Sequence, residues 1–308
     1  MEDKRWRMAQ VARMYFVENL TQQAIAREMH VSRSTVSRLL MEARRENVVS
    51  IHINYPWQVD SRLSTRLRKA YSLSTALVLV TEGLSPEEQN QGLGILGFHI
   101  LKHVLTPGCC VAVAPGSSVA ALVDALPPRP DLGCRVADLT GVPPFETPNA
   151  AGRLASLLGG VHFPITEPLL AAGPGALEDS LHHPGVREAL EQAAEAQVAL
   201  AGIGSAESWL DALCQAGAIT PEEARRALQA GAVAETAGIL LTARGEVLSG
   251  PLSARLLRLT PEKLREIQLV IATAAGASKV RAIQAALRSG LINILVTDDL
   301  TAQGLLKK

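Results

Sequence analysis

The sequence contains few aromatic residues, few cysteines and no net charge. Phe, Trp and Tyr make up 3% of the 308 residues, although hydrophobic residues make up 47%. The core must therefore be built from Leu, Val, Ala and Ile, which suit helices packed closely on a sheet. The four cysteines form no Cys-x-x-Cys pair, and no His/Cys cluster has zinc spacing. We expect small buried thiols in a reducing compartment, and neither a metal site nor a cofactor.

Long apolar runs are also missing. The longest apolar segments are near strand length, so no membrane span is expected. The charged start, MEDKRWRMAQ, leads into no signal-like segment, and we expect a cytoplasmic protein. The balance of 30 Lys/Arg against 30 Asp/Glu conceals an asymmetry, because residues 1–50 hold nine basic and six acidic residues. A mildly basic head on an acidic body is compatible with a head that binds nucleic acid.

Chain length suggests about two domains, and hydrophobic spacing predicts three helices in the first of them. The first helix is expected over residues 6–18, where apolar residues recur every three or four positions. Thr21 can cap a second helix through its hydroxyl group, and Ser32 can cap a third that runs to about Arg44. Residues 48–55, VVSIHINY, are rich in β-branched residues and alternate, which predicts a strand.

The second and third helices, with the short turn between them, have the pattern of a helix-turn-helix. Two short helices joined by a tight turn, the second opening with polar residues, are typical of this motif. Ala26 is small where the helices must cross, and Val31 can plug the turn. His30 stands where glycine is usual, and the left-handed conformation is accessible to histidine. The alternative is an ordinary amphipathic helix with a solvated polar face.

The third helix, within HVSRSTVSRLL, has one face suited to DNA. Val36 and Leu39 would anchor it, whereas Arg33 shares an outer face with Ser37, as Ser34 does with Arg38. Arginine can bond guanine edges or phosphates in a major groove, and hydroxyl groups can reach phosphates or bases. The predicted partner is double-stranded operator DNA. The predicted DNA-binding residues are Thr21, Gln22, Ser32, Arg33, Ser34, Thr35, Ser37 and Arg38.

The remainder of the chain alternates strands and helices. A connecting helix is predicted over residues 57–71, and further helices over 117–126 and 276–290. Buried strands without alternation, each followed by a helix, imply a parallel sheet covered on both faces. The predicted strands are residues 74–80, 109–114, 134–139, 161–165, 267–275 and 292–299, and a further strand begins residues 196–205 and ends there in a glycine-rich loop.

Three loops follow strands of this sheet, where ligands bind in such folds. They are residues 114–118 (APGSS), 202–205 (GIGS) and 274–279 (AAGASK). Glycines, hydroxyl groups and helix N-terminal amides can hold an oxyanion there. Lys279 falls in a first helical turn, where a cation opposes the helix dipole unless an anion is bound. Each loop alone is compatible with an ordinary tight turn, but three at one sheet edge favour a phosphate or polyol site.

With both halves considered, the chain resembles the SorC-type sugar-responsive transcriptional regulators. The resemblance rests on LTQQAIAREMHVSRSTVSRLLMEARRENVVSIHI in the head, and on GAVAETAG and IQLVIATAAGASKVRAIQAALRSGLINILVTDDLTAQGLL in the body. It implies a winged helix-turn-helix domain over residues 1–55. It also implies an effector-binding and oligomerisation domain over residues 56–308, with the Rossmann-like parallel α/β fold of the sugar-phosphate isomerase and deaminase superfamily. Such a protein is a homodimer or homotetramer whose affinity for operator DNA changes when a phosphorylated sugar or polyol binds.

The resemblance also implies the effector-binding positions. They are Gly116, Ser117, Ser118, Gly202, Gly204, Ser205, Glu235, Arg255 and Lys279. The chain departs from the family pattern at three places. Ala234-Glu235 replaces the usual Gly-Asp, Pro115 stands where Trp is frequent, and residues 274–276 read Ala-Ala-Gly instead of Ala-Gly-Gly. Glutamate in place of aspartate lengthens the side chain that would contact a sugar hydroxyl group.

Two other functions compete with a ligand-gated regulator. A sugar-phosphate isomerase needs a general acid and base beside the sugar carbonyl, and Asp138 and Glu235 are the available carboxylates. The seven histidines form no evident catalytic pair, and an isomerase has no use for a helix-turn-helix, so we expect no catalytic residues and no enzyme. The second alternative is a constitutive DNA-binding protein whose body only oligomerises.

Overall fold

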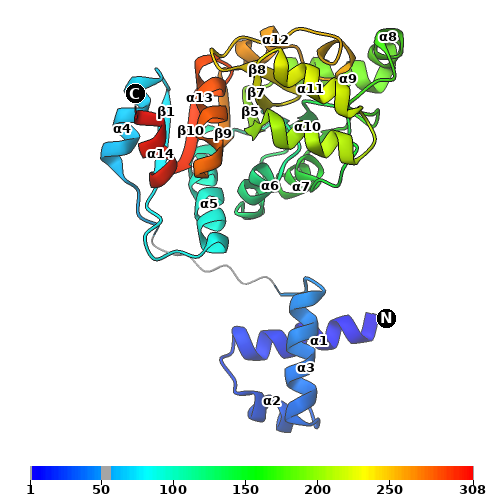
Figure 1. Cartoon of the computed structure of the whole chain (residues 1–308). Coiled ribbons are helices and arrows are strands. Elements are labelled where there is room, and N and C mark those ends of the chain that lie inside the picture. The colour runs from blue at the N-terminus through cyan, green and yellow to red at the C-terminus, as the bar shows by residue number, and fades with distance from the viewer. Residues whose placement is uncertain (1, 50–56, 308) are drawn as a thin grey trace. The chain divides into compact units, whose positions relative to one another are not determined.

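The computed structural model describes residues 2–49 and 57–307. The chain forms two compact units, Met1–Pro56 and Trp57–Lys308, each with its own core (Figure 1). Within the described residues no helix is long and apolar enough to cross a membrane.

The first unit is a bundle of three helices, as the hydrophobic spacing predicted. They are α1 (Glu2–Phe16), α2 (Gln22–Glu28) and α3 (Arg33–Arg45). Met8 and Val11 of α1, Ile25 of α2 and Val36 of α3 are completely buried against one another. Most of the strand predicted over residues 48–55 lies outside the described residues, because the structure does not describe residues 50–56.

Local hydrogen bonds set the ends of α2 and α3. The Thr21 hydroxyl accepts a hydrogen bond from the Ala24 amide (3.2 Å), and the Ser32 hydroxyl accepts one from the Thr35 amide (3.1 Å). Both predicted caps are confirmed. His30 adopts the left-handed conformation with φ of 54°, so the chain can turn sharply from α2 into α3 without a glycine.

The second unit is built on a sheet of seven parallel strands in the order β1-β10-β9-β5-β2-β3-β4. This confirms the predicted parallel sheet. The strands are β1 (Thr75–Leu79), β2 (Cys110–Val113), β3 (Arg135–Asp138), β4 (Val161–Phe163), β5 (Val198–Gly202), β9 (Leu269–Thr273) and β10 (Ile294–Asp298).

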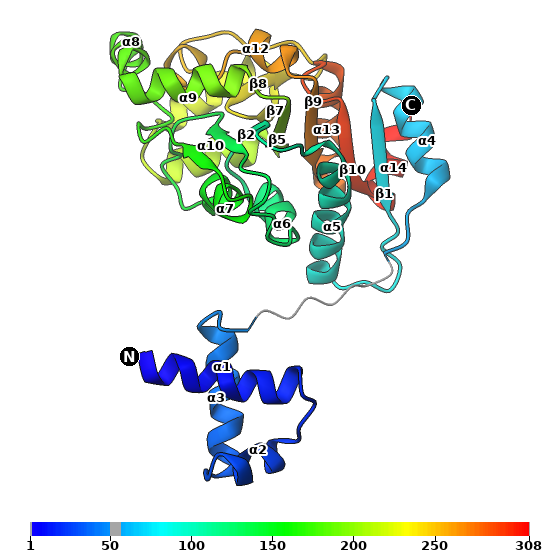
Figure 2. The ribbon, with the colours of Figure 1, turned by 180° about the vertical axis from the view of Figure 1, so that it is seen from behind.

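Helices cover both faces of the sheet. One face carries α5 (Pro86–Val104), α6 (Ser117–Asp124) and α7 (Ala150–Leu157), and α5 and α6 lie side by side in both views (Figure 1 and Figure 2). The other face carries α4 (Ser61–Ala70), α9 (Pro184–Ala194), α13 (Val280–Arg288) and α14 (Asp299–Leu306). Alternate residues of β5 point to opposite faces of the sheet. Val198 and Leu200 belong to the hydrophobic core on the α6 side, whereas Ala199 and Ala201 belong to the core on the opposite side.

A small antiparallel sheet was not predicted from the sequence. It consists of β6 (Gly204–Ser205), β7 (Ala232–Thr236) and β8 (Ile239–Thr242). Residues 196–205 were predicted to end a strand in a glycine-rich loop; they contain β5, and the loop also contributes β6 to the second sheet. Ala237 and Gly238 form the tight turn between β7 and β8 with φ of 47° and 72°, a conformation typical of two-residue hairpin loops.

The remaining helices surround these layers. They are α8 (Pro174–His182), α10 (Ala206–Gln215), α11 (Pro221–Gln229), α12 (Pro261–Glu266) and the 3₁₀ turns η1 (Ser253–Arg255) and η2 (Ala277–Lys279). Helices α10 and α11 pack against β7.

The connecting helix is shorter than predicted. Helix α4 begins at Ser61 because Asp60 caps it, with the Asp60 carboxylate accepting a hydrogen bond from the Leu63 amide (2.8 Å). The prediction that the helix spans all of residues 57–71 is therefore wrong at its start. Val59 instead forms an antiparallel bridge with Leu79. Strand β1 lies at the edge of the sheet, where backbone groups would otherwise be unpaired. The segment around Val59 pairs with these groups.

Candidate functional site

The polar face of α3 is accessible, as a groove-binding helix requires. Val36 and Leu40 hold the opposite face in the core of the first unit. None of the eight predicted DNA-binding residues is buried. The exposed ones are Thr21, Ser32, Arg33, Ser34 and Arg38, and the half-buried ones are Gln22, Thr35 and Ser37.

Three hydroxyl groups cluster at the start of α3. The Ser32 Oγ lies 2.7 Å from the Ser34 Oγ and 2.8 Å from the Thr35 Oγ1. Helix N-termini attract anions because their first amides point outward and the helix dipole is positive there. These hydroxyl groups therefore lie at a helix start, which suits contact with a phosphate of the DNA backbone.

The surface beside this helix start is hollowed. The hollow, about 770 Å³ in volume, is lined by Thr21 and Gln22 from the start of α2 and by Arg33 of α3. Asn19 and Gln23 line it too, although the sequence analysis did not single them out. Both lie two positions from Thr21 in the sequence, so their proximity to this cap is the signal that could have found them.

In the second unit, the three glycine-containing loops converge on one pocket of about 190 Å³. The loop after β2 contributes Gly116, Ser117 and Ser118. The segment after β5 contributes Gly202 and Gly204, and the start of α13 contributes Lys279. The structure thus brings together seven of the nine predicted effector-binding residues, the seventh being Glu235.

The pocket offers groups that suit an anion. Helix α6 begins at Ser117 after Gly116, and no side chain caps its first amides. Gly116 has φ of 155°, a value that residues with a side chain rarely adopt, so glycine is required for this turn. Lys279 is the N-cap residue of α13, and its ammonium group adds a positive charge to a second helix start.

Glu235 is the acidic group of the pocket. Its carboxyl oxygen Oε1 accepts a hydrogen bond from the Gly238 amide (2.6 Å). Burial raises the pKa of the Glu235 carboxyl to about 7, although the Gly238 hydrogen bond acts in the opposite direction. Near neutral pH this side chain can therefore be protonated and donate a hydrogen bond to a ligand oxygen.

Ser205 and Arg255 do not line this pocket, so their positions depart from the expectation. The Ser205 hydroxyl caps α10 by accepting a hydrogen bond from the Ser208 amide (3.2 Å). The Arg255 guanidinium forms an ion pair with Glu223 (Nη1 to Oε1, 2.7 Å) and donates from Nε to the Ala171 carbonyl (2.8 Å). Both side chains already have partners in the fold, and the motif comparison alone could not reveal this.

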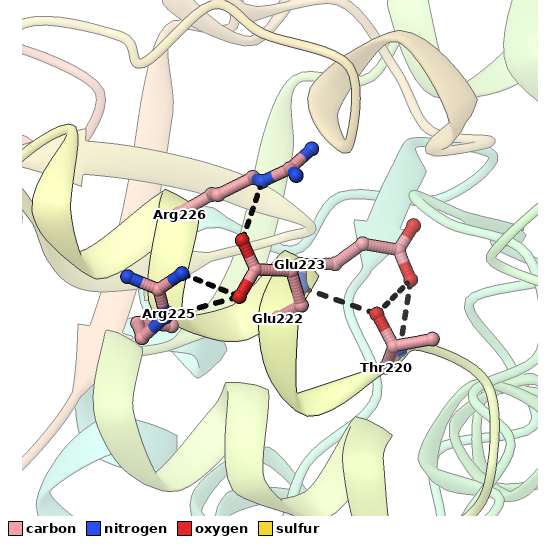
Figure 3. A network of polar contacts seen from close by, with 5 residues as sticks. All are labelled: Thr220, Glu222, Glu223, Arg225 and Arg226. Carbon is pink, nitrogen blue, oxygen red and sulfur yellow. Dashed lines mark hydrogen bonds and ion pairs between the residues drawn. The ribbon is translucent and has the colours of Figure 1, made fainter.

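The partner of Arg255 is itself held in place. Glu223 belongs to a capping box at the start of α11, where its carboxylate accepts hydrogen bonds from the Thr220 amide (2.8 Å) and hydroxyl (3.0 Å) (Figure 3). Its neighbour Glu222 turns away to pair with Arg225 and Arg226 on the same helix (Figure 3). Arg255 is therefore anchored to a rigid helix start.

Other pocket residues were missed from the sequence. Thr140, Phe145, Thr147, Trp209 and Ala237 also line the pocket. Thr140 closely follows β3, so the rule that placed the three loops could have found it. The others come from loops or helices whose place in the fold no local pattern indicates.

A second pocket of about 380 Å³ adjoins the first and shares Pro115, Thr140, Pro143 and Thr147 with it. Asp138, at the end of β3, lies within it, and its Oδ1 is 3.0 Å from the His162 Nε2. No catalytic pair involving a histidine was evident from the sequence, and the fold creates this carboxylate–histidine contact. Within the described residues, no group of three or more His, Cys, Asp or Glu side chains is placed to hold a metal ion.

Comparison with known proteins identifies the family. Residues 55–307 match the family model described as "Putative sugar-binding domain", and residues 7–46 match "Sigma-70, region 4". The transcriptional regulator LsrR of Enterobacter sp. (strain 638) is 31% identical over 303 residues, covering 97% of this chain and 92% of that protein. The sorbitol operon regulator of Klebsiella pneumoniae is 29% identical over 319 residues, covering 97% of each. The chain belongs to the SorC-type family of transcriptional regulators.

Solved structures agree with this assignment. The full-length sorbitol operon regulator SorC from Klebsiella pneumoniae superposes on this SorC-type chain with a TM-score of 0.75 at 27% identity, covering 97% of this chain and 98% of that one. The sugar-binding domain of a transcriptional repressor from Vibrio fischeri gives 0.74 at 28% identity, covering 80% of this chain and 98% of that one. This SorC-type protein is thus a transcriptional regulator with a helix-turn-helix unit and a sugar-binding unit.

Proposed function

We propose that this SorC-type regulator binds operator DNA through α3 and that a small phosphorylated sugar or polyol controls its affinity. The effector occupies the pocket at the carboxyl edge of the sheet. The convergence of Lys279 with three glycine-containing loops on one pocket carries the proposal.

The phosphate group lies against Lys279 and the start of α6. Backbone amides at an uncapped helix start and the hydroxyls of Ser117 and Ser118 supply donors. An anion there also offsets the unfavourable interaction of the Lys279 charge with the α13 dipole. The hydroxyl groups of the sugar or polyol face Glu235 and the backbone of Gly202 and Gly204. Ser205 and Arg255 act indirectly, through the structure around the pocket.

The first unit, over residues 1–55, is the DNA-binding domain. Its α3 enters a major groove with Arg33, Ser34, Ser37 and Arg38, while Thr21, Gln22, Ser32 and Thr35 contact the backbone. Residues 56–308 bind the effector and join copies of the chain into a homodimer or homotetramer. A protein that binds operator DNA works where the chromosome is, which in a bacterium is the cytoplasm.

The protein acts as a regulator and not as an isomerase. An isomerase has no use for the helix-turn-helix unit that precedes the sugar-binding unit in this chain. Incubation with aldose and ketose phosphates should therefore give no interconversion.

Lys279→Ala tests the placement of the effector. The substitution should abolish the effect of sugar phosphates on operator binding and leave effector-free affinity nearly unchanged, because Lys279 lies in the sugar-binding unit. In the wild-type protein the coupling should be about 1–3 kcal/mol, the range typical of allostery. Gel-shift titrations with and without a sugar-phosphate panel measure both quantities.

Lys102→Ala is the matched control, because Lys102 is exposed on α5 and lines neither the pocket that contains Lys279 nor the adjoining pocket that contains Asp138. It should respond to the panel as the wild-type protein does. A Lys279→Ala protein that still responds at wild-type effector concentrations would show that the phosphate lies elsewhere.

A further inference from the structure

The adjoining pocket, which contains Asp138 and His162, has no role in the function proposed so far. We propose that it is the subsite for the hydroxyl-bearing end of an extended polyol monophosphate, and that Asp138 excludes ligands with a second phosphate. This inference rests on the proposed function, which places the single phosphate beside Lys279.

Pocket size supports an extended ligand. The pocket around Lys279 has a volume of about 190 Å³, which is below the roughly 300 Å³ at which small-molecule sites usually begin. The adjoining pocket adds about 380 Å³, and the two pockets are neighbours because Pro115, Thr140, Pro143 and Thr147 line both. A ligand that starts at Lys279 and is longer than a triose therefore extends toward Asp138.

The charges of the adjoining pocket select against a second phosphate. Asp138 and His162 are the ionisable residues among the described residues that line it, and none of the described lining residues is Lys or Arg. A phosphate placed here would face a carboxylate without a permanent cation, and like charges at short range repel strongly. The two adjoining pockets thus differ in charge: one contains the Lys279 ammonium group and the other contains the Asp138 carboxylate.

The Asp138 carboxylate is held in position to accept hydrogen bonds from hydroxyl groups. His162 donates to its Oδ1 (3.0 Å) and the Ile165 amide donates to its Oδ2 (3.0 Å). Each carboxylate oxygen can accept more than one hydrogen bond, so capacity remains on the side that faces the pocket. Thr140 and Thr147 add hydroxyl groups along the path between the two ends. A neutral chain of hydroxyl groups satisfies this lining.

Calorimetric titration of the full-length protein with three probes tests the inference. Glycerol 3-phosphate reaches only the Lys279 end, a hexitol 6-phosphate reaches both ends with one charge, and a hexitol 1,6-bisphosphate carries a phosphate into the adjoining pocket. The hexitol 6-phosphate should bind best. Asp138→Asn, which keeps the shape of the side chain, should improve the affinity for the bisphosphate relative to the monophosphate by about tenfold, since it removes one like-charge contact.

Two further variants complete the experiment. Glu146→Gln removes an exposed carboxylate from the same loop region that lines neither pocket, and it should leave the bisphosphate-to-monophosphate ratio unchanged. His162→Gln should weaken binding of the hexitol 6-phosphate but leave that of glycerol 3-phosphate intact, which keeps the test decisive if Asp138→Asn does not fold.

The outcomes separate this inference from the proposed function. If glycerol 3-phosphate binds but the wild-type protein takes the bisphosphate as well as the monophosphate, only the Asp138 subsite is wrong. The same holds if Asp138→Asn and Glu146→Gln change the ratio equally. If none of the three probes binds, the phosphate site at Lys279 fails, and the subsite fails with it.

Discussion

Among single residues, two arginines of α3 are central to the proposed DNA-binding face. Arg33 and Arg38 are exposed, and neither is among the ion-paired residues of the described chain. Arg38→Ala should weaken specific operator binding by about 1–3 kcal/mol if this side chain reads a base. Gel-shift titration at fixed salt concentration measures the change.

Arg45→Ala is the matched control, because Arg45 is exposed at the other end of α3 and lies 3.8 Å from Glu46. It should have a smaller effect. Operator affinity that is unchanged in both Arg33→Ala and Arg38→Ala would show that this helix does not enter the groove.

Glu235 should make stability depend on pH. Its folded-state pKa is raised to about 7 by burial, above the ordinary value of 4.5. Between these values the folded protein holds more protons than the unfolded chain, so the free energy of unfolding falls as pH rises through this window. The loss should be about 3 kcal/mol by pH 8, because each unit of pKa shift corresponds to about 1.4 kcal/mol.

Glu235→Gln should remove this pH dependence, and melting temperatures of both proteins between pH 5 and pH 8 would show it. Glu207→Gln, which changes an exposed carboxylate on α10, should retain the wild-type profile. Parallel profiles for wild type and Glu235→Gln would mean that the carboxyl is ionised in the folded protein at pH 5.

At the scale of the elements, the contact between α5 and α6 depends on glycine. A Cβ atom on Gly94 would meet the Ala121 carbonyl oxygen of α6, which is rigid backbone. Gly94→Ala should therefore destabilise the protein by about 1–3 kcal/mol, as overpacking in a close-packed core does. Urea unfolding measures the change.

Gly175→Ala provides the same chemical change in open space, since a Cβ atom on Gly175 of α8 would meet nothing within 4 Å. It should be neutral or stabilising by no more than about 1 kcal/mol, because alanine favours helix more than glycine does. Equal losses in the two variants would contradict the close approach of α5 and α6.

For the molecule as a whole, we predict that coupling between effector and DNA runs through the chain that joins the two units in the sequence. The second unit begins at Trp57, and its first described residues pair with β1 through Val59 before α4 starts. We predict that residues 57–71, which include this start of the second unit and α4, act as the lever, because they directly continue the chain from the head. An effector shifts operator affinity only if it prefers one arrangement of the subunits.

Linked heads should bind DNA far more strongly than one head. An isolated fragment of residues 1–55 should bind on the order of 100-fold more weakly than the full chain, because oligomerisation converts the second contact into an intramolecular one. The first unit has its own core, and circular dichroism can verify that the fragment is folded. Equal affinity of fragment and full chain in a gel-shift titration would refute the need for oligomerisation.

Local sequence patterns predicted the features that depend on neighbouring residues. The caps at Thr21 and Ser32 and the sharp turn at His30 involve hydrogen bonds across three to five residues, so local spacing reveals them. The buried strands were recognisable for a similar reason, since burial on both faces leaves apolar runs. Because the carboxyl ends of parallel strands meet at one edge, the convergence of Gly116, Gly204 and Lys279 was also foreseeable.

Which side chains are free to act depends on contacts between distant parts of the chain, and these follow from the fold. Arg255 pairs with Glu223, 32 residues away, and Asp138 meets His162, 24 residues away, across neighbouring strands. Such contacts arise when elements that are distant in the sequence pack together, so the spacing of residues along the chain does not predict them. The antiparallel sheet around Glu235 could not be predicted for the same reason. Its strand β6 has two residues, which is too short to show a periodicity. This strand is stabilised by the strands that pair with it.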